Sequence, residues 1–361
     1  MIALSGLVLF LTVMAFMYPA VIRDGAAEGI LLCGRVLIPS LFPFMVLTGF
    51  IVKSGADRII SVPFGFLFHR LFRVPKALGA PVLLGLIGGY PVGAHLISER
   101  VKTGELDVKT ARRAACFTVG AGPAFIINAV GSSMLGSAKA GVLIFAASLL
   151  SSITLGFFSR FFSRSEKSLP VKNRGGSGIS DSFVLSASEA CTSVLTVTGF
   201  VVLFSALISL IKLAGLPFYA AKLLPFLSEA EAGSLIFSFL EVVTGCAHSS
   251  SSRFPLELTA FALGFGGLSV HCQILALLKD INLKYAVFFL ARLMGAALTV
   301  IFLKILLLLF PVSVTVSGGK TVPVPELSKG SIPLFAVLIL LCIVFLMSLP
   351  SGALTKREDV C

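Results

Sequence analysis

The sequence is poor in the residues that cover the surface of a soluble protein. Only 13% of its 361 residues are charged, whereas a soluble domain carries about 25%. Tryptophan is absent and tyrosine occurs only four times, so the chain has no clear aromatic belt. The seven cysteines are scattered, and their spacing matches neither a metal site nor a disulfide framework. These absences argue against an ordinary soluble domain, a zinc protein and a disulfide-rich secreted domain.

Apolar residues dominate what is present. They make up 57% of the chain, and several runs approach the ~20 residues that cross a bilayer. The sequence therefore predicts an all-α polytopic membrane protein, located in the cell membrane. Its net charge of +12 is attributed to basic cytoplasmic loops, because such loops are rich in Lys and Arg. We expect a lipid membrane as a partner and no nucleic acid.

Two apolar segments in the first half are interrupted in their middle, 77–98 by GGYP at 88–91 and 114–135 by GAGP at 120–123. Such breaks free backbone groups that lipid cannot satisfy, so protein or a water-filled cavity must cover them. Each half of 77–98 is long enough to cross only about half of the bilayer as a helix. Basic residues flank both of its ends, which places both ends on the cytoplasmic side. The segment 77–98 is therefore predicted to be a re-entrant helical hairpin.

The same plan recurs in the second half, with a broken segment at 231–253 and a glycine-interrupted span at 259–278. The corresponding residues are Gly93, Ala94 and His95 with Cys246, Ala247 and His248, and Phe117, Gly120 and Gly122 with Phe261, Gly264 and Gly266. Each unit has one span, one hairpin and two further spans, so it crosses the membrane an odd number of times. The second unit is therefore predicted to be inverted relative to the first, as in many transporters. A chance resemblance between apolar segments is the alternative.

The chain is accordingly divided into six parts with both termini in the cytoplasm. These are an N-terminal span at 1–28, a first inverted repeat at 29–161, a polar cytoplasmic linker at 162–187, a second inverted repeat at 188–310, an external loop at 311–331, and a C-terminal span and tail at 332–361. Within the first two parts, a polar loop is expected at 23–28 and an interfacial amphipathic helix at 64–72.

Three motifs, GGYPVGAH at 88–95, FTVGAGPAFIINAVGSSMLG at 117–136 and FGGLSVHCQ at 265–273, resemble those of the YlbJ sporulation integral membrane proteins, also called SpoVV. The resemblance covers nearly the whole chain and extends to the wider group with nucleoside-recognition Gate domains. It implies that each repeat is Gate-like, in a plan similar to concentrative nucleoside transporters. It further implies movement of dipicolinic acid into the developing endospore, a role in the spore cortex, and a location in the outer forespore membrane.

The glycine-containing breaks are the first candidate substrate contacts. A half-helix that starts at a break presents unpaired N–H groups and a positive dipole end, which suit an anion. Gly122 with Pro123 and Gly266 with Gly267 would each start such a half-helix. Asn128 and Ser269 could add hydrogen bonds. Helix capping and close packing between spans are the alternative roles.

Ionisable side chains inside apolar segments form the second set, because a charge there is costly unless it is paired or protonated. Glu241 could bind a proton or cation coupled to transport, form a structural pair, or cap the returning half of the second hairpin. Arg292 could extend to the membrane surface, or pair with Glu241 or an anion.

Histidines and the first hairpin tip complete the candidates. His95, His248 and His271 could bind a carboxylate oxygen, or could be hydrogen-bonded packing residues. Tyr90 could stack on an aromatic ring or anchor the tip. The predicted substrate-binding set is Gly89, Tyr90, Pro91, His95, Gly122, Pro123, Asn128, Glu241, Thr244, His248, Gly266, Gly267, Ser269 and His271.

These features favour a secondary transporter of a small organic anion. A carrier for a nucleoside and a non-transporting scaffold for spore assembly are the alternatives. An enzyme is not expected, because the chain shows no metal-ligand cluster, nucleophile elbow or phosphate-binding loop. No cofactor and no metal site are expected. The coupling ion, H⁺ or Na⁺, and assembly into a homo-oligomer are left open.

Overall fold

The computed structural model describes residues 12–162 and 178–312, and every regular element in these ranges is helical. Five of the helices are long and apolar enough to cross a membrane. The structure therefore confirms an all-α polytopic membrane protein. Nearly all of the predicted external loop and the whole predicted C-terminal span lie outside the described residues.

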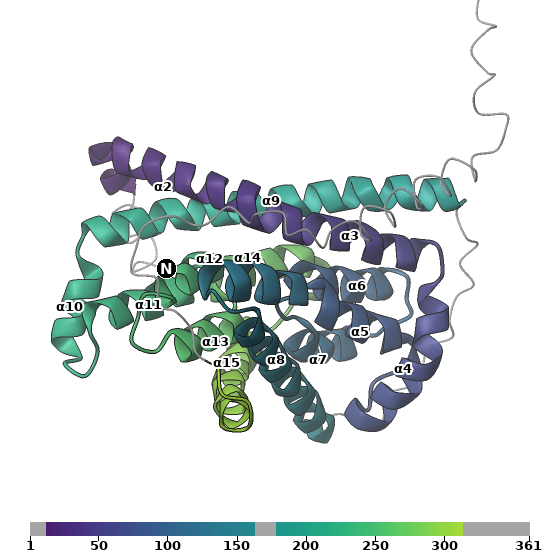
Figure 1. The fold of residues 1–361 in the computed structure, drawn as a ribbon. Coiled ribbons are helices and arrows are strands. Elements are labelled where there is room, and N and C mark those ends of the chain that lie inside the picture. The colour runs from purple at the N-terminus through teal and green to yellow at the C-terminus, as the bar shows by residue number, and fades with distance from the viewer. Residues whose placement is uncertain (1–11, 163–177, 313–361) are drawn as a thin grey trace, which may run out of the picture.

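Two long antiparallel helical rods form one side of the molecule (Figure 1). The first, Pro19–Lys53, has 35 residues and consists of α2 (Pro19–Leu32), a π-helical turn η1 (Cys33–Leu37) and α3 (Ile38–Lys53). The second is α9 (Ile179–Leu213), also of 35 residues. Gly25 faces Ser209 and Gly49 faces Ser186, so the two rods pack closely along their length. A helix of this length spans about 50 Å, more than the ~30 Å of a hydrocarbon core, so each rod must tilt or extend beyond it.

The polar loop predicted at 23–28 is wrong, because these residues are part of α2. Arg23 and Asp24 pair with each other at 3.0 Å on the exposed face of the helix. Gly25 and Gly29 are buried against Ser209 and Ser205 of α9. Packing on a partner helix thus outweighs the local polarity. Helix α9 likewise begins at Ile179, inside the predicted linker 162–187.

The remaining helices form two units with the same order of elements. The first unit contains α4 (Asp57–Phe72), η2 (Lys76–Leu78), α5 (Gly79–Gly88), α6 (Tyr90–Lys102), α7 (Val108–Thr118), the π-helix η3 (Ala124–Met134), α8 (Ala138–Ser159) and η4 (Arg160–Phe162). The second contains α10 (Leu216–Leu223), α11 (Glu229–Leu240), α12 (Val242–Ser249), α13 (Pro255–Phe265), α14 (Gly267–Leu277), η5 (Lys279–Ile281) and α15 (Tyr285–Leu309). The predicted division into two inverted repeats, at 29–161 and 188–310, stays a prediction.

Both helical hairpins are present. Helices α5 and α6 are separated by Gly89, whose φ of +94° favours glycine. Gly85 and Gly93 meet across this hairpin, where a Cβ on Gly85 would lie 2.8 Å from the Cα of Gly93. Helices α11 and α12 are separated by Glu241, and Gly245 meets Ser238 in the same way. Small residues at these positions allow the two arms of each hairpin to pack backbone to backbone.

Both predicted helix breaks are also present. The first lies between α7 and η3, over residues 119–123. The second lies between α13 and α14, where Gly266 and Gly267 have φ angles of +90° and +74°. Beyond the breaks, α8 and α15 pack against each other, and the Ser151 hydroxyl of α8 donates to the Gly295 carbonyl at 2.8 Å. The breaks are therefore held between the long rods and this helix pair.

Candidate functional site

The two hairpin tips and the two helix breaks meet at one small buried cavity beside the long rods. Its volume is about 20 Å³. The hairpins and breaks contribute Tyr90 and Pro91 from α6, Ala121, Gly122 and Phe125 from the first break and η3, Glu241, Val242 and Val243 from the second hairpin, and Val270 and Gln273 from α14. The rods contribute Leu37, Leu41, Val197 and Val201. The site is thus built from both units and both rods.

The first residues of α6, η3 and α12 line this cavity, and α14 contributes Val270 and Gln273 from farther along the helix. The first turn of a helix has N–H groups without intrahelical acceptors and carries a partial positive charge. Three such ends beside one cavity create a local positive potential. The arrangement therefore favours anionic groups at the centre of the molecule.

The Glu241 carboxyl group lies at one of these helix ends. The side chain is completely buried, and its oxygens accept hydrogen bonds from the backbone N–H groups of Val243 at 2.9 Å and Thr244 at 2.6 Å. Glu241 is therefore the N-cap of α12, which is one of the roles that the sequence left open. Within the described residues, it forms no ion pair. The two N–H groups give this buried carboxyl group hydrogen-bond partners.

Arg292 of α15 stabilises the opposite ends of the broken helices. Its side chain is only 5% exposed, so the predicted extension to the membrane surface is wrong. The guanidinium donates to the carbonyls of Val119, Gly264 and Phe265, which end α7 and α13. These carbonyls have no helical donor and carry partial negative charge, so a cation suits them. Arg292 thus connects the first helix break to the second.

Each helix break packs against the tip of its own hairpin. A Cβ on Gly122 would lie 2.9 Å from the Ile87 carbonyl oxygen and 3.1 Å from the Gly89 nitrogen. A Cβ on Gly267 would lie 3.0 Å from the Val242 nitrogen and 3.1 Å from the Glu241 Cα. No side chain fits between these backbones. Glycine is therefore required at both breaks by close approach, as well as by positive φ at Gly267.

Tyr90 anchors the first hairpin tip to the second unit. Its hydroxyl donates to the Leu263 carbonyl at 2.6 Å, and the Arg292 guanidinium lies over its ring at 5.7 Å. Tyr90 also lines the cavity. The anchoring role left open by the sequence is therefore present in the structure.

Several predicted substrate contacts do not line the cavity. Asn128 is exposed on η3, and its backbone carbonyl accepts a hydrogen bond from the Ser133 hydroxyl. Pro123 is partly buried at the start of η3. Ser269 is buried, but its hydroxyl accepts from the Gln273 amide at 3.3 Å. Thr244 contributes its backbone N–H to the Glu241 cap. Of these residues, Thr244 contributes to the site through its backbone, whereas Asn128 is exposed.

The three candidate histidines lie apart from one another. His95 Nε2 contacts the Glu189 carboxylate of α9 at 3.2 Å. The His248 ring packs on Phe237 with centroids 4.6 Å apart. His271 is 1% exposed, with Nε2 3.2 Å from the Phe265 carbonyl oxygen. None lines the cavity, and within the described residues no group of His, Cys, Asp or Glu is placed to hold a metal ion.

Sequence reasoning missed Gln273 and the contributions of the rods. Gln273 is a lone amide in an apolar run, one helical turn after Ser269, and this polarity was a usable signal. Val197 and Val201 are four residues apart on α9 and therefore share a face. Nothing in their local sequence distinguishes that face from the lipid-facing sides of the same helix.

Comparison with known proteins finds one curated relative at significant similarity. The chain is 25% identical over 337 residues to the sporulation integral membrane protein YlbJ of Bacillus subtilis (strain 168). The alignment covers 84% of this chain and 82% of that protein. No family model matches the chain, and no solved structure matches it. The similarity thus extends over most of both proteins, as the resemblance in the sequence motifs led us to expect.

Proposed function

Because the chain belongs to the YlbJ family of sporulation integral membrane proteins, we propose that it is a secondary transporter of a small organic anion that acts during endospore formation. The favoured substrate is dipicolinic acid, with a nucleoside or another organic anion as the alternative. On this proposal the protein is not an enzyme and carries no cofactor. It would cross the outer forespore membrane several times, with both termini in the cytoplasm.

The observation that carries this proposal is that three half-helix N-terminal ends, those of α6, η3 and α12, meet at one cavity between the two units and the rods. Broken helices and hairpins leave backbone N–H and C=O groups without helical partners, which is costly inside a membrane. A purely structural helix bundle would avoid this cost. Discontinuous helices whose N-termini point at anionic substrate groups are a general feature of secondary transporters. A scaffold would be expected to have continuous spans instead.

The cavity is too small for the proposed substrate in this conformation. Its volume of about 20 Å³ accommodates roughly one water molecule, and a planar dicarboxylate is many times larger. Binding therefore requires the hairpin tips to separate from the rods, at contacts that involve Leu41 and Val201. A closed state of this kind is one that an alternating-access carrier must pass through.

Glu241 imposes a further condition on anion binding. An ionised carboxylate at the cavity wall would repel a dianion. Because the cavity lining is mainly apolar, it would screen that repulsion only weakly. We propose that Glu241 carries a proton or is accompanied by a cation when the anion binds. Arg292 does not pair with Glu241, since its guanidinium is used by the three carbonyls of the helix breaks.

The proposal is tested by counterflow in proteoliposomes. Purified protein is reconstituted, and exchange of labelled dipicolinate is measured with unlabelled dipicolinate, nucleosides or simple carboxylates as competitors. Saturable exchange that dipicolinate inhibits most strongly supports the proposal. Exchange inhibited best by a nucleoside supports the alternative substrate. A well-folded protein that exchanges none of these compounds would indicate the scaffold.

A further inference from the structure

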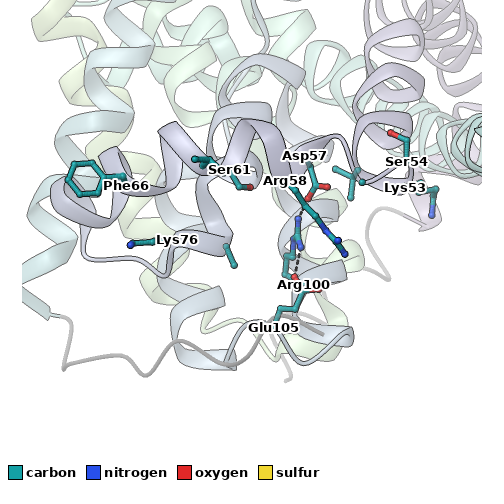
Figure 2. A pocket seen from close by; sticks show the side chains of 13 residues that line it. Lys53, Ser54, Asp57, Arg58, Ser61, Phe66, Lys76, Arg100 and Glu105 are labelled. Atoms are coloured by element: carbon teal, nitrogen blue, oxygen red, sulfur yellow. Dashed lines mark hydrogen bonds and ion pairs between the residues drawn. The ribbon is translucent and has the colours of Figure 1, made fainter. Parts of the chain in front are cut away.

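A second and much larger cavity lies away from the hairpin tips, between α4, the end of α3 and the base of the first hairpin (Figure 2). Its volume is about 720 Å³. Helix α4 lies at one end of the molecule, and its counterpart in the second unit, α10, lies at the other (Figure 1). None of the residues that line the central cavity lines this one.

Helix α4 presents an apolar stripe to its surroundings. Ile59, Val62 and Phe66 are spaced three and four residues apart and are 78%, 75% and 61% exposed. The opposite face packs Phe68 and Phe72 into the core. Three large apolar side chains at this exposure are unfavourable in water and favourable against acyl chains. Val62 and Phe66 also line the cavity, so its wall is continuous with the stripe.

The orientation of α4 suits the surface of a membrane. The helix makes an angle of 113° with the segment Lys76–Gly88, which contains the first arm of the hairpin. If that arm enters the membrane, α4 lies roughly parallel to the membrane surface, with the stripe on its lipid side. This geometry depends on the membrane location of the protein and not on transport.

The other side of the cavity is charged. Its basic side chains come from the end of α3, from α4 and from η2, namely Lys53, Arg58 and Lys76 (Figure 2). Lys53 pairs with Glu189 at 2.8 Å. The acidic side chains of the lining, Asp57 and Glu105, both pair with the buried Arg100.

This ion-pair network joins α4 to α6 and gives the cavity a fixed wall. Arg100 offsets one of the two carboxylate charges, and Lys53, Arg58 and Lys76 leave the lining net positive. Arg58 and Lys76 are exposed and lie on opposite sides of the cavity, with Arg58 near Asp57 and Lys76 toward Phe66 (Figure 2). The cavity thus combines a net positive charge with an apolar wall on α4.

We infer that this cavity binds the headgroup of an anionic phospholipid, with its acyl chains against the α4 stripe. A headgroup phosphate inside the cavity would be attracted by Arg58 from one side and by Lys76 from the other, at the level of an in-plane helix (Figure 2). Free phosphate or a soluble dicarboxylate would use the basic residues but would gain nothing from Val62 and Phe66. The apolar wall therefore favours a lipid over a soluble anion.

The test measures lipid binding to delipidated full-length protein in neutral detergent at low salt, by native mass spectrometry. The probes are phosphatidylglycerol, phosphatidylcholine with the same acyl chains, and inorganic phosphate. The double variant Arg58→Gln/Lys76→Gln removes two charges from the cavity. The control Lys139→Gln/Lys222→Gln removes two exposed charges elsewhere. The charge-retaining variant Arg58→Lys/Lys76→Arg shows whether any loss is caused by charge or by misfolding.

Phosphatidylglycerol should bind the parent more tightly than phosphatidylcholine. The cavity variant should bind it about 10- to 30-fold more weakly, since each basic residue near a membrane surface contributes measurably to anionic lipid binding. The control and the charge-retaining variant should bind like the parent. Phe66→Ser should weaken lipid binding without changing phosphate binding.

Equal losses in the cavity variant and the control would overturn the inference, as would equal binding of the two lipids. Inorganic phosphate that competes with phosphatidylglycerol at similar concentration would indicate a soluble-anion site instead. None of these outcomes depends on dipicolinate exchange, so the lipid site and the proposed transport can fail separately.

Discussion

The hydroxyl of Tyr90 donates a hydrogen bond of 2.6 Å to the carbonyl of Leu263, 173 residues later in the chain. Tyr90 begins the returning arm of the first hairpin, and Leu263 belongs to the last turn of α13 before the second helix break. This bond links the two units beside the candidate site. Arg292 strengthens the link, because it lies over the Tyr90 ring and donates to the adjacent Gly264 carbonyl.

Tyr90→Phe removes this hydrogen bond while it keeps the ring. We expect the free energy of unfolding to fall by about 1 kcal/mol, with up to ~3 kcal/mol if the buried Leu263 carbonyl stays unsatisfied. Thermal unfolding in detergent measures the change. Tyr219→Phe is the matched control, because Tyr219 is 62% exposed on α10. Equal melting temperatures for the two variants would show that the Tyr90 bond contributes nothing.

Arg292→Lys retains the charge but cannot span carbonyls on two different helices. We expect stability to fall and exchange activity to be lost, because lysine would leave at least one of the three buried carbonyls unsatisfied, at a cost of about 1–3 kcal/mol for each. Lys304→Gln on the exposed side of the same helix should leave both properties unchanged. An Arg292→Lys protein with parental stability would mean that the guanidinium is not needed to hold the breaks together.

Gly122→Leu and Gly266→Leu should each abolish dipicolinate exchange with little loss of membrane insertion. A side chain at Gly122 would push the first break away from its hairpin tip, and Gly266 has a φ of +90° beside the Tyr90 ring. Gly199→Leu is the control, since nothing lies within 4 Å of a Cβ at that position on α9. Exchange at the parental rate in both break variants would move the site elsewhere.

Glu241→Gln mimics a protonated carboxyl and keeps an oxygen that can cap α12. We expect it to bind dipicolinate and to lose the pH dependence of exchange. Glu241→Ala removes the cap, which should lower stability by about 0.5–2 kcal/mol and weaken binding. Counterflow and binding are measured for the parent and both variants from acidic to neutral pH. Parental pH dependence in the Gln variant would leave Glu241 with the capping role alone.

Lys102 and Lys139 are predicted to lie on opposite sides of the membrane. They flank the broken span of α7 and η3, and the more basic flank is expected in the cytoplasm. Single cysteines at these positions, in a background without the native cysteines, are labelled with an impermeant reagent. Labelling of both from the same face would contradict the re-entrant hairpin and the proposed topology.

The sequence alone determined the helical membrane class, both hairpins and both helix breaks. Apolar run length and interruption by glycine or proline are local properties, and they act on the backbone wherever the segment is placed. The breaks at Gly122 and Gly266 and the hairpin at Gly89 therefore appear where the sequence predicts them. The cap made by Glu241 was among the predicted roles because its donors follow within three residues.

Only the tertiary structure decided what those elements surround. Arg292 is buried because the carbonyls of Val119 and Gly264, which lie 173 and 28 residues earlier in the chain, compensate its charge. Residues 23–28 are helical because α9 covers Gly25. Val201 lines the cavity, whereas His95 faces Glu189 and Asn128 faces outward. Each outcome depends on contacts between segments that are distant in the sequence. The free energy of these contacts exceeds the local preference of a few polar residues, and the neighbouring sequence does not reveal which contacts will form.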